Sequence, residues 1–574
     1  MSNLQDSEKP NKLLLSISII GLASCLLLLF PYTQTLIIGI GEKFIGRNFD
    51  NGKWMQVISQ YWGITALCFG FIILHLTIKP DLEICKKIFI IAAIVISCIS
   101  IIVIITMQIR VRSLWTDEAF LARNIISRDW STLLVPPLSS LQSAPVLYVI
   151  VVKLLGSLFG YSEFSLRLFS FLAFIALLIS EKEFTRKALN YDNYQTAFVV
   201  AATAGLPIFI WYSNEFKPYM GDALFVVLTL FSYFCYTQGK IKLPLLTALC
   251  IIFFGFSTPV IFFTGGIFIY EFALSVIRKN KKMALSVFGC GALILVISVL
   301  YYNWWHSSVL GGMQSFWGSF AEENSLLKRL LTLFRGINNS DASFLVILVP
   351  LALIGIISFI KFQNKIAYPV LISLVLVFAA SFMGFWPLTG RLWLFFPAIV
   401  LIFTPAGIDF IHARITNKRI TRLIEFSFFS AIVLFYAINT LGFTGNKMFF
   451  PGQEVNPLIY YVKNHIKDGE KLYLYSASTF GYKMGYSTTR IGNVHEDNIL
   501  FSSDTNQWSH DRPGSELESI LKHERVYLIF QHHLFGKGIA NGLDILRNHG
   551  TITEILNIHD TPLYLFERHT TVDK

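Results

Sequence analysis

The sequence predicts an α-helical polytopic membrane protein (about 13 transmembrane helices) with a C-terminal extracytoplasmic α/β domain. Of its 574 residues, 54% are hydrophobic and only 14% are charged, and the mean hydropathy is +0.57, whereas soluble globular domains carry about 25% charged residues. The long apolar runs lie in residues 1–442, and residues 443–574 have the composition of a water-exposed domain. These observations exclude a soluble enzyme, a disordered chain and a fibrous protein. They leave open a transporter, a channel or a membrane enzyme.

A helix needs about 20 apolar residues to cross a bilayer, and thirteen segments approach this length. Two of them are separated only by Thr258-Pro259, and the first of that pair is short. Cys25 follows a lipoprotein-like cleavage sequence, but the apolar run continues beyond it, so we expect an uncleaved first helix. The predicted spans are 13–31, 57–78, 87–107, 164–180, 195–211, 219–237, 243–257, 260–277, 283–303, 342–360, 366–383, 391–411 and 424–442.

The distribution of Lys and Arg predicts the orientation of these spans. Short loops rich in positive charge stay on the cytoplasmic side of a membrane. Such loops alternate here with longer loops of mixed charge, which include 32–56, 108–163 and 304–341. Thirteen spans with a cytoplasmic N-terminus therefore place residues 443–574 outside. The net charge of +11 reflects this distribution and does not point to nucleic acid.

The external loop 108–163 carries the most informative acidic residues. Asp117 and Glu118 are adjacent and lie about ten residues beyond the predicted end of a span. A carboxylate at the membrane surface can act as a general base, or can hold a phosphate through a divalent cation. Both residues are also compatible with an ordinary solvated loop. Residues 145–160 are apolar but short, and we expect a helix that lies along the outer surface beside Asp117.

Charged groups recur where other spans reach the same side. Arg167 lies at the outer end of one predicted span, Lys217 follows another, and Arg391 opens a third. Any one of them is explained by anchoring at the membrane interface. Taken together, basic groups on one membrane face suit a phosphate headgroup.

Four segments carry a resemblance to the polyprenyl-phosphate-dependent membrane glycosyltransferases of the GT-C superfamily. The chain is most similar to glycosyltransferase family 39, the protein O-mannosyltransferases and the aminoarabinose lipid A transferases. Trp115-Thr116-Asp117-Glu118-Ala119 resembles the Asp-Glu motif of their first external loop. The other segments are Ala144-Pro145-Val146-Leu147-Tyr148 with Leu158-Phe159-Gly160 and Glu163-Phe164-Ser165-Leu166-Arg167-Leu168, then Tyr212-Ser213-Asn214-Glu215-Phe216-Lys217-Pro218-Tyr219, and Arg391-Leu392-Trp393-Leu394-Phe395-Phe396-Pro397.

The chain departs from the family pattern at several positions. Ala144 stands for a Pro, and Lys217 stands for an Arg, which keeps the charge but loses the bidentate fork. Gln142-Ser143-Ala144-Pro145 stands where the aminoarabinose transferases have Glu-x-Lys-Pro-Pro, so their acceptor is not carried over. Two additional spans precede the Asp-Glu loop, and about 80 N-terminal residues lie outside the resemblance.

The resemblance implies a transmembrane glycosyltransferase domain in residues 1–442, with a catalytic external loop at 108–163. Its donor would be a polyprenyl-phosphate sugar, and its acceptor a lipid, glycan or protein of the cell envelope. The protein would lie in a bacterial cytoplasmic (inner) membrane, with no nucleic-acid partner. Asp117 would be the general base of an inverting displacement, with Glu118 supporting it or sharing a divalent cation (Mg or Mn), since adjacent carboxylates disfavour double ionisation. Arg167, Lys217 and Arg391 would bind the donor phosphate, and Tyr148, Glu215 and Tyr219 would contact substrate.

The sequence of residues 443–574 predicts a small α/β domain. Strands are predicted at 471–475, 525–530 and 562–566, and helices near 455–467, 515–523 and 540–548. We expect this domain to cover the active site or to receive the acceptor. His532-His533 suggests a metal site, but no third ligand has a suitable spacing.

Two other functions remain open at this point. A secondary transporter would place ionisable groups near the bilayer midplane and would show repeated, interrupted helices, whereas the charges here cluster at span ends. A polysaccharide polymerase or ligase acting on lipid-linked glycans would use the same kinds of residue, and so would a non-catalytic relative. The sugar, the acceptor and the prenyl chain are not readable from the sequence.

Overall fold

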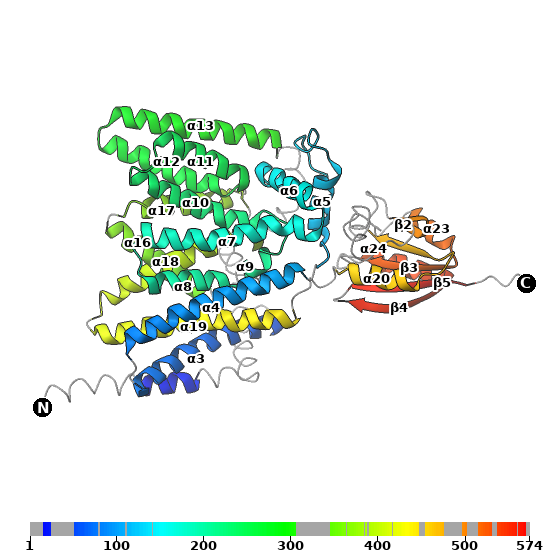
Figure 1. Cartoon of the computed structure of the whole chain (residues 1–574), viewed down its shortest axis with the longest axis horizontal. Coiled ribbons are helices and arrows are strands. Elements are labelled where there is room, and N and C mark those ends of the chain that lie inside the picture. The colour runs from blue at the N-terminus through cyan, green and yellow to red at the C-terminus, as the bar shows by residue number, and fades with distance from the viewer. Residues whose placement is uncertain are drawn as a thin grey trace, which may run out of the picture.

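The computed structural model describes residues 15–24, 51–78, 81–109, 112–139, 142–305, 345–362, 364–383, 385–386, 390–415, 417–446, 454–475, 496–501, 515–530, 537–558 and 561–569. A large helical bundle is followed by a smaller unit built on a β-sheet (Figure 1). Helices of the bundle lie side by side along one common direction. The sheet unit stands at one end of the bundle, next to α5 (Thr116–Ser127) and α6 (Val146–Phe159).

Each predicted span overlaps a described helix, and of the first span, 13–31, only residues 15–24 are described. Seven stretches are long and apolar enough to cross a membrane among the described residues. The shorter apolar helices include residues 15–24 and α11. The predicted pair 243–257 and 260–277 is indeed two helices, α11 and α12. The elements of the bundle are α3 (Asn51–Ile78), α4 (Leu82–Ile109), α7 (Glu163–Ala188), α8 (Asn193–Gly205), α9 (Pro207–Tyr212), α10 (Tyr219–Thr237), α11 (Leu243–Phe256), α12 (Val260–Ile277), α13 (Lys281–Trp305), α16 (Leu345–Lys361), α17 (Ala367–Phe382), η1 (Gly390–Trp393), α18 (Phe395–His412) and α19 (Lys418–Asn446).

Two predicted spans have different forms in the structure. The span expected at 195–211 is interrupted after Gly205, because Pro207 lacks a backbone N–H and begins the new helix α9. The span expected at 391–411 starts with the 3₁₀ turn η1 before α18 begins at Phe395. Both interruptions occur next to predicted site residues. Irregular backbone inside a membrane protein is tolerated where it is surrounded by protein. We therefore take these breaks as positions where the backbone is shaped to serve the site.

The helices differ in how much of their surface is covered by protein. The apolar window of α18 is 78% buried, whereas that of α13 is 17% buried. α18 is therefore a central helix and α13 a peripheral one. Large apolar side chains are exposed on the peripheral helices, among them Ile277 and Leu285, as expected for surfaces that face lipid tails. At the centre, Gly407 of α18 lies so close to the Leu351 carbonyl of α16 that a Cβ would collide with it. Small residues of this kind allow membrane helices to pack closely.

The C-terminal unit is a three-layer α/β structure. Its five-stranded sheet has the order β2-β1-β3-β5-β4, with β1 parallel to β2 and β3, and β5 antiparallel to β3 and β4. Apolar residues of α20 (Asn456–His465) pack on one face, and those of α23 (Ser515–Leu521) and α24 (Lys537–His549) on the other. The strands are β1 (Lys471–Tyr475), β2 (Ile499–Phe501), β3 (Arg525–Phe530), β4 (Gly550–Ile558) and β5 (Thr561–Arg568), and the 3₁₀ turn η2 (Glu496–Asn498) precedes β2.

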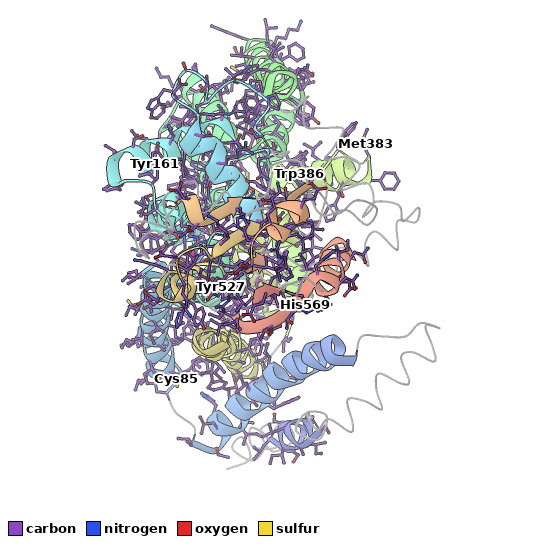
Figure 2. All side chains as sticks on the ribbon, turned by 90° about the vertical axis from the view of Figure 1, so that its right-hand side faces the viewer. Cys85, Tyr161, Met383, Trp386, Tyr527 and His569 are labelled. Carbon is purple, nitrogen blue, oxygen red and sulfur yellow. The ribbon has the colours of Figure 1, made fainter. Side chains whose placement is uncertain are left out.

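The three predicted strands and three predicted helices of this unit are confirmed. The sequence prediction missed β2, which has only three residues, and β4. Burial along β4, an edge strand of the sheet, is mixed rather than strictly alternating, and its pairing with β5 has a register shift between Glu554 and Leu556, which interrupts the alternation of faces. Viewed from the side of the sheet, Tyr527 and His569 lie in front of the helices, and Tyr161 lies nearby at the upper left (Figure 2).

Candidate active site

Asp117 and Arg391 form an ion pair at the end of the bundle next to the sheet unit. Arg391 Nη2 donates to Asp117 Oδ2 at 2.6 Å, across 274 positions of sequence. Asp117 lies in the first turn of α5, and Arg391 lies in η1. Their side chains are 28% and 24% exposed. The structure thus joins the proposed base to one of the proposed phosphate-binding residues, and it places Asp117 on a helix instead of in the loop that the sequence suggested.

Two aromatic rings hold the Arg391 guanidinium in place. Its centre lies 5.1 Å from the ring centroid of Trp115 and 5.5 Å from that of Tyr219, within the range of cation–π attraction. Tyr219 packs edge-on against Tyr212, with centroids 5.6 Å apart. Burial lowers the pKa of Arg391, but Tyr219 and Asp117 outweigh it and hold the pKa above its usual value. Arg391 is therefore a fixed, permanently positive group beside Asp117.

Glu118 lies next to Asp117 in sequence but is completely buried. Arg167 donates to its two carboxylate oxygens, from Nε at 3.0 Å and from Nη2 at 2.6 Å. The backbone N–H of Phe216 donates to Oε1 at 2.6 Å, and that of Trp115 to Oε2 at 3.2 Å. Burial raises the pKa of Glu118, but the positive charges of Arg167 and Arg112 lower it by more, so the pKa falls below its usual value. The two neighbouring acids thus have separate environments, and Glu118 is held as a carboxylate.

Arg167 is fully engaged by this network. Besides its bonds to Glu118, it donates from Nη1 to the Arg112 carbonyl at 2.7 Å and from Nη2 to the Ser113 carbonyl at 3.0 Å. Its side chain is 4% exposed. The sequence interpretation gave Arg167 to the donor phosphate, but its geometry suits a different task. It fastens α7 to Glu118 and to the residues that lead into α5.

The sequence interpretation gave Arg112 no role. Its Nη2 lies 3.6 Å from Glu118 Oε2 and donates to the Asn214 carbonyl at 3.4 Å. Its guanidinium lies 4.8 Å from the ring centroid of Trp211. The sequence signal for Arg112 was its place in an Arg-x-Arg pair shortly before the Trp-Thr-Asp-Glu motif. Sequence spacing alone does not tell that the Arg112 side chain is buried.

Lys217 and Glu215 lie in the turn between α9 and α10, close to the ion pair. Lys217 Nζ donates to Gln142 Oε1 at 2.8 Å, and burial lowers the pKa of Lys217 to about 8. Trp211 Nε1 donates to Glu215 Oε2 at 3.2 Å, whereas Glu215 Oε1 is buried without a hydrogen-bond partner among the described residues. Burial, helped by the charge of Glu118, raises the pKa of Glu215 to about 7. Both residues titrate close to neutral pH.

Tyr148 is a core residue beneath this cluster. Its ring meets Phe169 edge-on at 4.9 Å between centroids and stacks on Phe216 at 6.2 Å. The side chain is fully buried, and its hydroxyl has no hydrogen-bond partner within the described part of the chain. Tyr148 therefore packs beneath Phe216, and a substrate contact by Tyr148 would require the side chains that cover it to move. Tyr219, by contrast, faces Arg391 directly.

The sheet unit is bonded to the residues that enter α5. Ser113 Oγ donates to Glu454 Oε2 at 3.2 Å and accepts from the backbone N–H groups of Val455 and Asn456 at 3.1 Å and 3.0 Å. Asn456 Nδ2 also donates to Glu163 Oε1 at 2.9 Å. Burial raises the pKa of Glu454 to about 7. The α/β unit is thus anchored four residues before Asp117.

The surroundings of Glu118 do not fit the cation suggested for Asp117 and Glu118. Four N–H bonds from Arg167, Trp115 and Phe216 converge on its two oxygens. A divalent ion at those oxygens would face the Arg167 guanidinium at close range, and like charges repel strongly in a buried site. The His532-His533 pair lies outside the described residues.

The sequence matches no family model, and no curated protein matches it. Among solved structures, the chain is similar to ArnT from Cupriavidus metallidurans, seen in an apo state and bound to undecaprenyl phosphate. Both are 11% identical to this chain, and the alignments cover 83% of this chain and 97% of ArnT. The TM-scores are 0.45 for the apo structure and 0.44 for the lipid-bound one. The helices and the sheet of this chain define a polytopic integral membrane protein with a C-terminal α/β unit.

Proposed function

We propose that the protein is a glycosyltransferase that moves a sugar from a polyprenyl phosphate to an acceptor in the cell envelope. One observation carries the proposal: a carboxylate, Asp117, is paired with a fixed guanidinium, Arg391, at one end of a membrane-spanning bundle. The electrostatic field of Lys217 acts on both groups. A general base can take the proton of an acceptor hydroxyl, and two cations can stabilise the charge that develops on a leaving phosphate.

The ion pair suggests how the donor is recognised. The donor phosphate would replace Asp117 as the partner of Arg391, because a phosphate offers the guanidinium a bidentate pair of oxygens. Lys217 would add a second positive charge to the same phosphate. Displacement from Arg391 would leave the Asp117 carboxylate available to the acceptor. Donor binding would thus prepare the base.

The reaction follows as a single displacement. The acceptor hydroxyl oxygen forms a bond to the anomeric carbon while the bond from that carbon to the phosphate oxygen breaks, and the configuration inverts. The hydroxyl proton passes to Asp117. The bonding electron pair leaves with the polyprenyl phosphate, whose charge Arg391 and Lys217 compensate. We propose that these two residues make a divalent cation unnecessary for the step.

The remaining predicted residues have supporting tasks. Glu118 and Arg167 position the start of α5 and thereby Asp117. Glu215 has one buried carboxylate oxygen without a protein partner in the described structure, which is suited to accept a hydrogen bond from a sugar hydroxyl. Tyr219 presents its ring beside Arg391. We propose that these two residues contact the substrate.

We propose that the site faces the outside of a bacterial cytoplasmic membrane. The loops rich in Lys and Arg would be cytoplasmic, with the N-terminus on the same side. The C-terminal unit, residues 443–574, would be extracytoplasmic and would cover the site or receive the acceptor. Its bonds to Ser113 place it next to the entry of α5. The transmembrane part, residues 1–442, would carry the chemistry.

The decisive experiment compares Asp117→Asn with a matched variant of the same segment. Membranes containing the protein are incubated with host lipid extract, and polyprenyl-phosphate sugars and free polyprenyl phosphate are followed by mass spectrometry. Asp117→Asn should remove sugar transfer, while Asp129→Asn, on an exposed turn of the same segment, should retain it. Full activity of Asp117→Asn would overturn the assignment. Analysis of envelope glycans with and without the protein would then distinguish a single-sugar transferase from a polymerase or ligase.

A further inference from the structure

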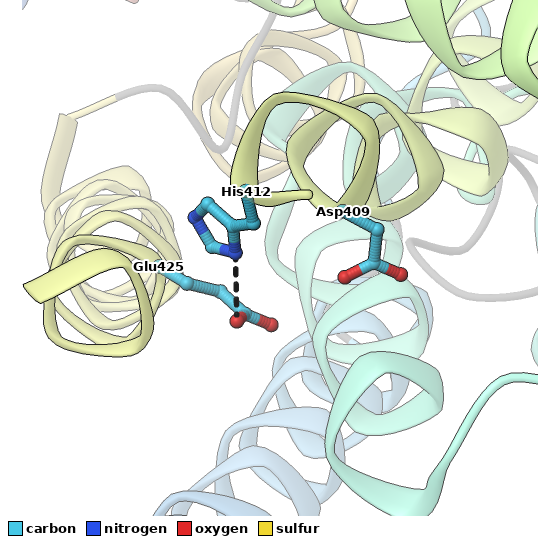
Figure 3. A group of neighbouring side chains, drawn as sticks. All are labelled: Asp409, His412 and Glu425. Carbon is cyan, nitrogen blue, oxygen red and sulfur yellow. Dashed lines mark ion pairs between the residues drawn. The ribbon is translucent and has the colours of Figure 1, made fainter. Parts of the chain in front are cut away.

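Three potential metal ligands meet between α18 and α19, far from the site described above. Asp409 and His412 belong to the last turn of α18, and Glu425 belongs to the second turn of α19 (Figure 3). One donor atom from each lies within 4.8 Å of the other two. Arg391 precedes the opposite end of α18, which is about 27 Å away by the rise of an 18-residue helix. This cluster is therefore separate from the Asp117–Arg391 site.

The separation of the donor atoms fits ligands of one ion better than a hydrogen bond. His412 Nδ1 and Glu425 Oε2 are 3.5 Å apart, which is longer than an ordinary hydrogen bond between nitrogen and oxygen. Ligand atoms placed tetrahedrally at about 2.0–2.1 Å from a zinc ion lie about 3.4 Å from each other. The His412–Glu425 separation thus matches one edge of a tetrahedral zinc site, and a donor atom of Asp409 lies within 4.8 Å of both.

The placement of the three residues on two helices is the usual one for metal sites in helical bundles. Residues at positions i and i+3 share one face of a helix. His412 faces Glu425 of α19, whereas the Asp409 carboxylate lies beside it on the side of α8 (Figure 3). The dinuclear carboxylate sites of helical bundles likewise combine a carboxylate-x-x-His motif on one helix with a carboxylate from another. One imidazole nitrogen with two carboxylates favours a divalent transition ion over Mg²⁺, which prefers oxygen ligands and water.

A neighbouring residue holds one ligand in place. Gln195 Nε2 donates to Asp409 Oδ2 at 2.7 Å, and Gln195 is itself fixed in the first turn of α8 by its reciprocal bonds with Asp192. Such outer contacts commonly orient metal-binding carboxylates. Two carboxylates and a neutral imidazole carry a net negative charge. Lys86 and Arg422 oppose this charge from neighbouring positions and Asp192 adds to it, so the surroundings keep a negative charge that would attract a divalent ion.

We infer that Asp409, His412 and Glu425 bind a divalent transition-metal ion of the Zn²⁺ class, with water at the remaining position, and that the ion joins α18 to α19. His412 and Glu425 are mostly shielded between the helices, whereas Asp409 is exposed, so the ion can enter from water. The site is structural: it fixes the end of α18 opposite Arg391. It is independent of the proposed enzymatic function.

The test uses the full-length protein in detergent, stripped with a chelator and then dialysed against Zn²⁺ or Mg²⁺. Metal content is measured by mass spectrometry, and thermal unfolding is followed with each ion. We expect about one tightly held Zn²⁺ per chain, a higher unfolding temperature with Zn²⁺ and no such increase with Mg²⁺. His412→Gln and Asp409→Asn should each lose this ion and the increase, while His465→Ala, which removes an exposed histidine of the sheet unit, should keep both.

Two results would overturn the inference. One is equal zinc content in wild type and both ligand variants, which would show that any bound ion lies elsewhere. The other is the absence of bound zinc in the wild type, which would leave His412 and Glu425 as a helix-to-helix contact only. The glutamine and asparagine variants stay polar and close in size to the original side chains. Their folding is checked by the unfolding transition in the presence of chelator, which should match that of the stripped wild type.

Discussion

Replacement of Glu118 by glutamine tests whether the buried network really supports the start of α5. Glu118 is the carboxylate between Arg167 and Arg112, and four N–H bonds end on it. The amide of glutamine has one oxygen to accept these bonds, and its NH₂ group would meet donors. Both guanidinium groups would remain buried and would lose their shared anion.

The size of the effect follows from the burial of the network. Removal of one partner of a buried ion pair costs about 3–5 kcal/mol, because the remaining charge is left uncompensated. Glu183→Gln is the matched control, since it removes an acid from an exposed pair with Lys187 in the same bundle, and such pairs contribute less than about 1 kcal/mol. We expect Glu118→Gln to lower the free energy of unfolding by about 3–5 kcal/mol and Glu183→Gln to leave it almost unchanged.

The assay is equilibrium unfolding in mixed micelles of increasing SDS content, followed by tryptophan fluorescence. Glu118→Asp serves as a second variant, because it keeps the charge and shortens the side chain, and it should fall between the wild type and Glu118→Gln. If Glu118→Gln unfolds at the same SDS content as Glu183→Gln, the network does not stabilise the bundle. The assignment of Glu118 and Arg167 to positioning would then be refuted.

Three further predictions concern the donor and the topology. Arg391→Lys should weaken binding of undecaprenyl phosphate about 10- to 100-fold, as expected for loss of a charge-assisted bond of about 1.5–3 kcal/mol, and unchanged affinity by native mass spectrometry would contradict this. Binding of undecaprenyl phosphate by the wild type should weaken as the pH rises from about 7 to about 9, because Lys217, with a pKa of about 8, loses its positive charge and Glu215, with a pKa of about 7, becomes negative. Lys217→Arg should reduce this pH dependence. An equal slope in both proteins would exclude Lys217 as its cause. In a background without native cysteines, Asp497→Cys should react with a membrane-impermeant maleimide on intact cells and Lys240→Cys only after lysis, and the reverse pattern would invert the topology.

The large-scale architecture was predictable because it depends on averages over many residues. Apolar runs of membrane length are determined by the energetics of the bilayer, and each predicted span has its helix. The interruption at Pro207 and the turn before Phe395 were not predicted. At both places the apolar run continues across the break, so hydropathy alone does not detect it. The backbone geometry there depends on the surrounding helices.

The sequence predicted which residues lie at the candidate site better than it predicted what each of them does there. Asp117 and Arg391 do meet, whereas Glu118 and Arg167 pair with each other in the interior. Sequence does not specify which of two adjacent acids turns inward, because that choice depends on Arg112 and the Phe216 amide, which come from distant segments. The contacts of Ser113 with Glu454 span 341 positions. The Asp409, His412 and Glu425 cluster was missed for the same reason: only the Asp-x-x-His spacing within α18 is visible in the sequence.

The central claim is that Asp117 activates an acceptor for attack on a polyprenyl-phosphate sugar. The most direct measurement is the release of free polyprenyl phosphate from the host's own lipid-linked sugars, by mass spectrometry, with purified wild type and Asp117→Asn reconstituted in liposomes. The account predicts release, accompanied by a glycosylated acceptor, with the wild type and none with Asp117→Asn, although both bind undecaprenyl phosphate. Equal release by the two proteins, or none by the wild type when donor and envelope acceptors are supplied, would contradict it.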